Sequence, residues 1–231
     1  MTGFVKFMDE NMQLCESPLE YLYDQQDFMV VGCLGAQGVG KSTIMSLLTS
    51  SYGTDIFPVQ DMSHHESRAN CTSGIDFFVT KNRVIYLDTQ PILSKTNLEL
   101  QSLQFAAFLF SVCHVIIFVQ DWFVDPNLVR FLQTAEMLKP SSTTNMDQDY
   151  VEYYPHIVFL HNKAELQDFT PNTAEKIKIV TATSCLVLFT QFILKIVTFH
   201  SCNGSRAQEH HKKEIEKTKD FLLSEIMYKH K

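Results

Sequence analysis

The sequence predicts an α/β fold of three layers, in which helices cover both faces of a mostly parallel sheet. Along the chain, apolar runs that are typical of buried parallel strands alternate with segments of helical periodicity. A glycine-rich turn joins the first of these strands to a helix. The 231 residues, 45% of them hydrophobic, are enough for one core with additional segments at its ends.

The glycine-rich turn fits G-x-x-x-x-G-K-[ST], the P-loop or Walker A pattern, over residues 35–42. Glycines let backbone N–H groups turn toward phosphate oxygens, and the following helix presents its N-terminal dipole to the anion. The lysine brings positive charge to the phosphates, and the hydroxyl after it can ligate Mg²⁺. A glycine turn without a ligand and a loop that has lost its nucleotide are the alternatives. The expected phosphate-binding residues are Gly35, Gln37, Gly38, Val39, Gly40, Lys41, Ser42 and Thr43.

Before the P-loop, apolar residues three and four positions apart predict a helical stripe that packs on the sheet rather than in a coiled coil. The stripe consists of Val5, Met8, Met12, Cys15, Leu19 and Leu22. Ser17 is expected to cap a second short helix that has Pro18 at its first position. Residues 28–34 predict the strand that enters the P-loop, and residues 43–49 predict the helix that leaves it.

After a polar, irregular segment at 51–72, two apolar runs predict a hairpin with a two-residue turn at Lys81-Asn82. This hairpin is expected to provide one antiparallel edge strand. Further elements follow in alternation. The expected strands are 75–80, 83–88, 114–119 and 156–160, the expected helices are 97–113 and 126–138, and a polar loop is expected at 140–149.

This order of elements resembles that of small GTPases, and the resemblance predicts a metal site. Asp88 ends an apolar strand, where P-loop proteins place the aspartate that holds Mg²⁺ through water. Thr72 lies in the polar loop where a switch threonine would reach the same ion. The expected metal-binding residues are therefore Ser42, Thr72 and Asp88. The alternatives are that Asp88 caps the next segment and that Thr72 is an ordinary loop residue.

Two departures from a hydrolytic GTPase predict nucleotide binding with little or no hydrolysis. The chain reads Asp88-Thr89-Gln90-Pro91 where D-x-x-G is usual, and proline has no N–H to donate to a γ-phosphate. Ile92 stands where a glutamine would position the attacking water, and Gln90 is offset from that place.

A second motif predicts the base site. Asn162, Lys163 and Glu165 resemble N-K-x-D, which reads guanine. Glu165 keeps the negative charge of the usual aspartate on a longer arm, and this puts guanine selectivity in doubt. The expected cofactor is Mg²⁺ with ATP or GTP, and the base stays open.

With these motifs, the chain closely resembles the family of nonsense-mediated mRNA decay factors of the SMG-nine type, from about residue 4 to residue 169. The most specific shared runs are D-T-Q-P-I-L at 88–93 and Q-D-W-F at 120–123. The broken switch motif is therefore a trait of the family. The longer shared runs lie at 28–42, 72–80, 84–93, 100–115, 119–125, 130–140 and 153–164.

The resemblance implies a G-like domain that pairs with a related G-like domain in a subunit of the SMG-eight type. The pair would bind and restrain a phosphatidylinositol-3-kinase-like protein kinase, which phosphorylates the decay helicase on messages with premature stop codons. The chain would then be a regulatory subunit of mRNA surveillance rather than an enzyme. Its expected location is the cytoplasm, with the nucleus as a second location. The alternative is an active, small-GTPase-like switch that hydrolyses GTP.

The resemblance stops near Pro171, so three parts are expected: an N-terminal helical segment at 1–26, the G-like domain at 27–169 and a divergent tail at 170–231. The tail contains 16 uncharged residues at Ile179–Leu194 within an apolar stretch that ends at Phe199. This run is short for a membrane span, so a packed helix is preferred. We expect a truncated or alternative isoform in which the C-terminal part of the domain is incomplete or replaced.

The net charge and the cysteine pattern argue against several functional classes of protein. A net charge of −7, with no basic stretch in the first 170 residues, argues against direct nucleic-acid or lipid binding. None of the six cysteines forms a C-x-x-C pair, so reduced thiols are expected rather than a zinc site. The early acidic residues argue against a signal peptide. His64-His65 are expected as solvated loop residues, and Trp122 as an interface anchor or a core-edge residue.

Overall fold

The computed structural model describes residues 1–23, 26–49, 56–59, 72–93, 99–121, 125–141, 153–163, 170–173, 175–176, 179–180, 194–198, 220 and 224. The strands are β1 (Val5–Met8), β2 (Met29–Leu34), β3 (Ile75–Val79), β4 (Val84–Thr89), β5 (Val115–Asp121), β6 (His156–Asn162) and β7 (Leu194–Thr198). The helices are α1 (Leu19–Leu22), α2 (Lys41–Thr49), α3 (Glu99–Val112) and α4 (Pro126–Leu138).

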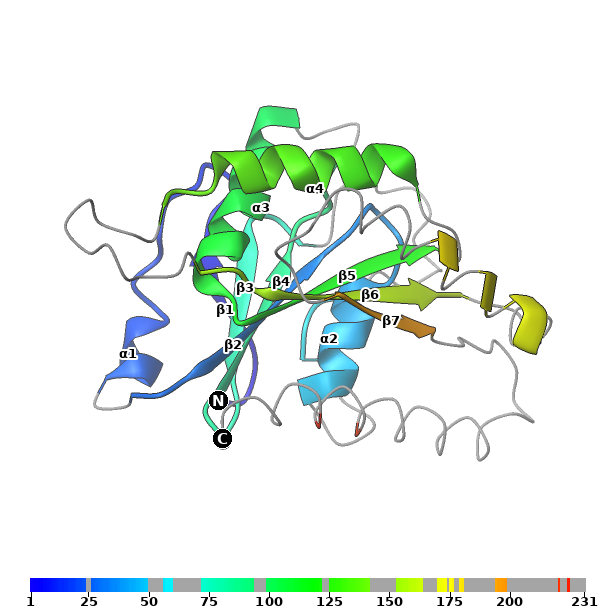
Figure 1. Cartoon of the computed structure of the whole chain (residues 1–231). Helices are drawn as coiled ribbons and strands as arrows, with labels where there is room; N and C mark the ends of the chain where they lie inside the picture. The colour runs from blue at the N-terminus through cyan, green and yellow to red at the C-terminus, as the bar shows by residue number, and fades with distance from the viewer. Residues whose placement is uncertain are drawn as a thin grey trace, which may run out of the picture.

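In the described part of the chain, these strands form one seven-stranded sheet in the order β1-β3-β4-β2-β5-β6-β7. The strands from β4 to β7 are parallel, whereas β1 and β3 are antiparallel to their neighbours. Helices α3 and α4 cover one face of the sheet, and α2 lies against the other (Figure 1). The predicted three-layer, P-loop G-domain-like fold is thereby confirmed.

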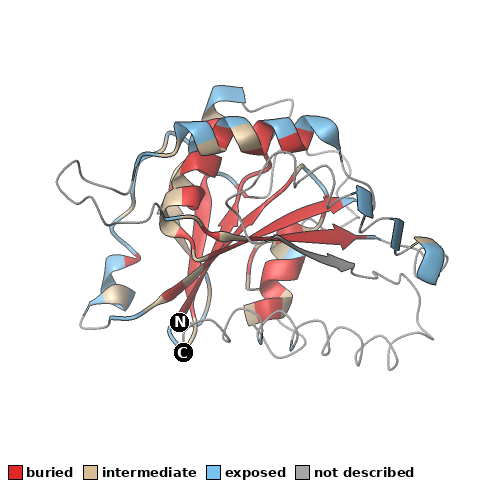
Figure 2. Cartoon of the chain, in the orientation of Figure 1, coloured by how far each residue is buried: buried red, intermediate tan, exposed pale blue. Residues whose placement is uncertain are grey.

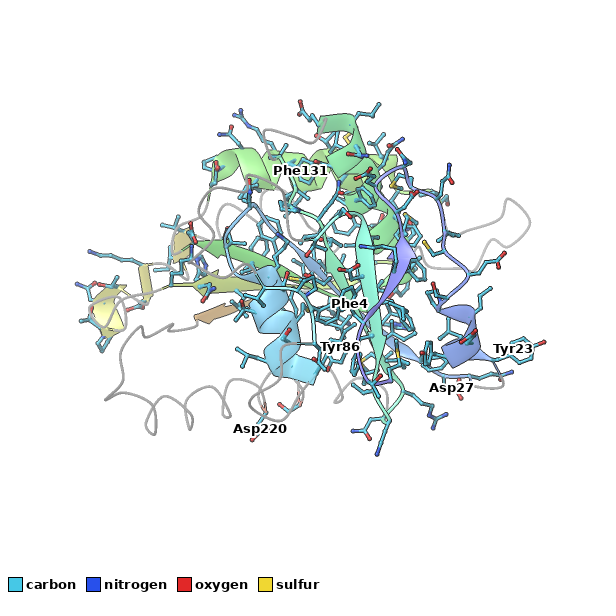
Figure 3. The ribbon with its side chains drawn as sticks, turned by 180° about the vertical axis from the view of Figure 1, so that it is seen from behind. Phe4, Tyr23, Asp27, Tyr86, Phe131 and Asp220 are labelled. Atoms are coloured by element: carbon cyan, nitrogen blue, oxygen red, sulfur yellow. The ribbon has the colours of Figure 1, made fainter. Side chains whose placement is uncertain are left out.

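The central strands are buried on both faces, which explains why their sequences are continuous apolar runs (Figure 2). Along β5, Ile116 and Phe118 pack toward α3 and α4, whereas Ile117 and Val119 pack toward α2. The rings of Phe118 and Phe159 meet edge to face with their centroids 5.4 Å apart. Side chains such as Tyr86 and Phe131 lie inside the molecule, while Tyr23 projects from the end of α1 (Figure 3).

Helix α4 has the predicted bounds because its first turn contains a strong start signal. The Asp125 side chain accepts a hydrogen bond from the Asn127 N–H over 2.8 Å, and Pro126 occupies the first turn, where its missing N–H is not needed.

The prediction of a helix at the N-terminus is wrong for residues 5–8. These residues form β1, which pairs with β3 in antiparallel orientation, and Phe7 stacks on Phe77 with ring centroids 6.1 Å apart. An apolar spacing of three and four residues over so short a segment does not exclude a strand, and pairing with β3 decides the outcome. Only α1 is helical in the described residues 1–23, and Pro18, not Ser17, occupies its N-cap.

The hairpin of β3 and β4 is confirmed, but its turn and its place in the sheet differ from the prediction. Thr80 and Val84 bracket a three-residue turn in which Arg83 has φ +60°. A residue with positive φ at the third position matches the strand twist in such turns. Strand β1 lies outside β3, so β1 rather than the hairpin is the antiparallel edge of the sheet.

The tail contributes a strand to the sheet. Strand β7 pairs with β6 in parallel, with Ile157 opposite Leu194 and His161 opposite Thr198. Leu194 thus lies in a strand where a helix was expected, and the sheet extends past the expected boundary at residue 169. Residues 181–193 of the apolar stretch lie outside the described residues. No helix in the described part of the chain is long and apolar enough to cross a membrane.

Candidate functional site

The P-loop lies between β2 and α2, at the carboxyl ends of the parallel strands, where open α/β sheets bind ligands. Its glycines permit close approach of neighbouring chain segments. A Cβ atom on Gly35 would lie 2.2 Å from the carbonyl oxygen of Val119. Gly40 has φ +94°, and a Cβ there would lie 2.5 Å from Nδ2 of Asn162. The loop is therefore held against the ends of β5 and β6.

The predicted phosphate-binding residues lie together in this loop and in the first turn of α2. Gln37, Gly38 and Thr43 are exposed, whereas Val39 and Lys41 are buried. Nζ of Lys41 donates a hydrogen bond to the carbonyl oxygen of Ala36 over 3.0 Å, so the ammonium lies against the start of the loop. Burial lowers the pKa of Lys41.

The three predicted metal-binding residues meet at one carboxylate oxygen. The Ser42 hydroxyl donates to Oδ2 of Asp88 over 2.6 Å, and the Thr72 hydroxyl donates to the same oxygen over 3.1 Å. The two hydroxyl oxygens lie 3.3 Å apart. These side chains come from α2, from the segment before β3 and from β4.

Asp88 is fully buried, and burial raises the pKa of its carboxyl to about 6, against the effects of Ser42, Lys41 and Thr72. Its other oxygen, Oδ1, is buried and has no hydrogen-bond partner among the described residues. Oxygen donors of this kind are the ones that Mg²⁺ prefers. An unpaired buried oxygen beside two hydroxyls fits a metal ion, and the cofactor itself stays a prediction.

The side chains of Gln90 and Ile92, which follow Asp88, both contact other parts of the protein. Oε1 of Gln90 accepts a hydrogen bond from the Gly74 N–H over 2.8 Å, and the Gln90 N–H donates to the carbonyl oxygen of Gly74 over 2.8 Å. Ile92 is 1% exposed and packs in the core under α3 and α4. Its N–H donates to the carbonyl oxygen of Gly35 over 3.1 Å. The Gln90 side chain is thus bonded to Gly74, and the Ile92 side chain is part of the apolar core.

The predicted base motif is only partly described. Nδ2 of Asn162 donates to the carbonyl oxygen of Val39 over 2.7 Å and so contacts the P-loop directly. Lys163 is exposed, and its Nζ lies 3.4 Å from Oδ1 of Asp121. Glu165 lies outside the described residues, as do His64, His65 and Trp122.

Sequence reasoning missed a charged pair beside the metal-binding residues. Lys6 on β1 forms an ion pair with Asp76 on β3, and Asp76 lies opposite Asp88 across the antiparallel ladder. Asp76 is 1% exposed. The signal that could have revealed it is an acidic residue inside an otherwise apolar strand, I-D-F-F-V.

The chain is similar to curated proteins named as SMG9. It is 48% identical over 214 residues to "Nonsense-mediated mRNA decay factor SMG9" of Xenopus laevis, covering 78% of this chain and 42% of that protein. The identity to the protein of the same name from Salmo salar is 45% over 210 residues, covering 76% of this chain and 42% of that protein. "Protein SMG9" of Drosophila melanogaster is 31% identical over 176 residues, and the match covers 65% of this chain and 35% of that protein. The chain thus spans less than half the length of these relatives.

Among solved structures, Toc33 from Arabidopsis thaliana, in the form of the dimerization-deficient mutant R130A, shares the fold. The TM-score is 0.52 at 12% identity, covering 93% of this chain and 89% of Toc33. At this identity the likeness concerns the fold alone. No family model matches the chain.

Proposed function

Because this chain is homologous to SMG9 nonsense-mediated mRNA decay factors over about 78% of its residues, we propose that it is a regulatory nucleotide-binding subunit in nonsense-mediated mRNA decay. The observation that carries the nucleotide-binding part is the convergence of Ser42 and Thr72 on Asp88 beside a P-loop. The names of the relatives support the assignment to nonsense-mediated mRNA decay.

In this proposal, the P-loop backbone and Lys41 hold the phosphates of ATP or GTP, and Ser42, Thr72 and Asp88 hold Mg²⁺. The ion neutralises phosphate charge when it is bound. Asp88 supplies the negative charge, and its burial keeps competing water away from Oδ1. Asn162 supports the loop from β6 by its hydrogen bond to Val39, and Glu165 is proposed to contact the base together with Asn162 and Lys163.

The proposed role is regulatory and not enzymatic. Gln90 is bonded to Gly74, and Ile92 lies in the core, so neither can activate water in these positions. The alternative, a switch that hydrolyses GTP, would need a different residue for that step.

The proposed partners are a related G-like subunit of the SMG-eight type and, through the pair, a phosphatidylinositol-3-kinase-like kinase. The net charge of −7 favours protein partners over direct contact with RNA. The proposed location is the cytoplasm, with the nucleus as a second location.

Nucleotide identity after gentle purification tests this proposal. We expect the wild-type chain, co-expressed with the G-like partner, to release close to one equivalent of ATP, GTP or a diphosphate on denaturation. The Lys41→Ala/Ser42→Ala variant should release none but should still bind the partner. Absence of nucleotide from both proteins, with no binding of added ATP·Mg²⁺ or GTP·Mg²⁺, would remove the nucleotide-binding function. Failure of the wild-type chain to bind the partner would remove the proposed pairing.

A further inference from the structure

One side chain of the N-terminal strand contacts residues that neighbour the predicted metal-binding residues. Lys6 lies on β1, where it is opposite Asp76 of β3. Its Nζ forms the ion pair with Asp76 and also donates a hydrogen bond to the carbonyl oxygen of Ser73 over 2.6 Å. Ser73 follows Thr72 directly, so the Lys6 ammonium is one residue from a predicted metal ligand.

The short segment Thr72–Gly74 is fixed at each of its three residues by protein groups. The Thr72 hydroxyl donates to Asp88, the Ser73 carbonyl accepts from Lys6, and Gly74 forms two hydrogen bonds with Gln90. Gly74 has φ +69°, and a Cβ there would lie 2.1 Å from the carbonyl oxygen of Met8. The segment thus packs closely against the end of β1 and is also hydrogen-bonded to Lys6 of that strand.

The charges around Lys6 explain why a cation is needed there. Asp76 and Asp88 are directly opposite on neighbouring antiparallel strands, so both carboxylates lie on the same face of the sheet. Two buried carboxylates at that spacing repel each other, and each costs desolvation energy. Lys6 lies opposite Asp76 on its other side and supplies the compensating positive charge.

We propose that Lys6 is a positioning residue that holds Thr72 at the metal site, so that the segment Thr72–Gly74 keeps its place whether or not nucleotide is bound. This inference deepens the proposed function and rests on it for the role of Thr72. In a conventional switch protein the γ-phosphate and its Mg²⁺ order the corresponding loop. Here β1 and Gln90 supply the ordering contacts, and nucleotide serves as a structural ligand of the subunit rather than as a signal read through this segment.

Hydrogen exchange of the Gly74 and Gln90 amides tests the proposal in the complex with the G-like partner. In the nucleotide-free wild-type protein, both amides should be protected, and added ATP·Mg²⁺ or GTP·Mg²⁺ should change their exchange rates by less than about twofold. In Lys6→Met, exchange without nucleotide should rise by about tenfold or more, since a hydrogen bond to a charged donor is lost. Lys6→Arg, which keeps the charge and the donor, should restore protection. Lys81→Met, at the exposed turn between β3 and β4, is the matched control and should exchange as wild type does.

Lys6→Met leaves Asp76 buried without its partner and can unfold for that reason alone. The double variant Lys6→Met/Asp76→Asn removes the buried charge as well and still lacks the hydrogen bond from residue 6 to the Ser73 carbonyl. It should be folded and show the same rise in exchange at Gly74. A second readout is the ratio of nucleotide affinities with Mg²⁺ and with chelator, which should fall in both Lys6→Met proteins and not in Lys6→Arg.

If the amides of the folded double variant are as protected as those of wild type, the proposal is overturned, because the Lys6–Ser73 hydrogen bond would then not hold the segment in place. So would wild-type protection that develops only when nucleotide is added. The comparison of nucleotide-free proteins needs no ligand. If neither the wild-type chain nor the Lys41→Ala/Ser42→Ala variant binds nucleotide, the proposed function fails, while the effect of Lys6 on exchange at Gly74 is still measured.

Discussion

The side chain of Asn162 and the backbone of Val39, 123 positions apart in sequence, are joined by a hydrogen bond of 2.7 Å. Nδ2 of Asn162 donates, and the carbonyl oxygen of Val39 accepts. The bond connects the end of β6 to the phosphate-binding loop, and the absence of a side chain on Gly40 leaves the space for it. A residue that the sequence assigns to the base site therefore also shapes the phosphate site.

Replacing Asn162 by Ala should destabilise the domain by roughly 1–3 kcal/mol, because it leaves the buried Val39 carbonyl without its donor. Nucleotide affinity should fall as well, since the loop loses its support from β6. Urea unfolding and nucleotide titration measure the two effects. Asn82→Ala, in the exposed hairpin turn, is the control. Equal stabilities of the two variants would show that the bond does not support the loop.

Replacing Asp88 by Asn should separate stability from metal binding. The amide oxygen can still accept the hydroxyl hydrogen bonds of Ser42 and Thr72, and a buried charge is removed. We expect stability to be unchanged or raised by up to about 2 kcal/mol, while the Mg²⁺-dependent gain in nucleotide affinity is lost. Asp27→Asn, at an exposed position, should behave as wild type in both assays. Retention of the full Mg²⁺ effect in Asp88→Asn would place the ion elsewhere.

Wild-type turnover of GTP and ATP should be close to background, and Ile92→Gln should not create it. Because Ile92 is 1% exposed, glutamine there buries an amide in the core and should lower stability by roughly 2–4 kcal/mol. Ile92→Val, which keeps the site apolar, should lower stability by only about 1 kcal/mol. Multiple-turnover assays and thermal unfolding test both statements. A wild-type rate constant on the order of 1 s⁻¹ would show that another residue activates water.

Thiol reactivity should report the packing beneath the P-loop. Cys33 and Cys113 are fully buried, and burial raises the pKa of both thiols, whereas Cys15 is partly exposed. In the native protein at mildly alkaline pH, iodoacetamide should therefore modify Cys15 and spare Cys33 and Cys113. Peptide mass spectrometry gives the extent at each site, and labelling in denaturant should reach all three. Rapid native labelling of Cys33 would mean that the sheet opens beside the P-loop.

Much of the fold could be predicted because its signals are local. The apolar run before Gly35, the proline and aspartate at the start of α4 and the paired runs of the hairpin each indicate an element within a few residues of themselves. The P-loop could be predicted for the same reason, since its backbone shape depends on adjacent glycines. The side chains of Ser42, Thr72 and Asp88 contact one another, because their places in the order of elements bring them to one end of the sheet.

The errors arose where long-range pairing decides the structure. Residues 5–8 carry apolar spacing that fits a helix over a longer window, and they form a strand because β3 offers an unpaired edge. Leu194 is the last residue of an uncharged run that fits a helix, and it forms a strand because β6 offers the opposite edge. Hydrogen-bonding groups at a sheet edge favour pairing over any weak local preference.

By itself, the sequence determined the phosphate-binding loop, the alternation of strands and helices, and the loss of the usual hydrolytic residues at Pro91 and Ile92. Only the tertiary structure decided that Lys6 reaches Asp76 and Ser73, that Asn162 holds Val39, and that Gln90 is bonded to Gly74. Each of these contacts depends on how strands are paired, and the first two join parts of the chain that are far apart in sequence. Register is set by which edges meet and which faces are buried, and periodicity within one segment does not contain that information.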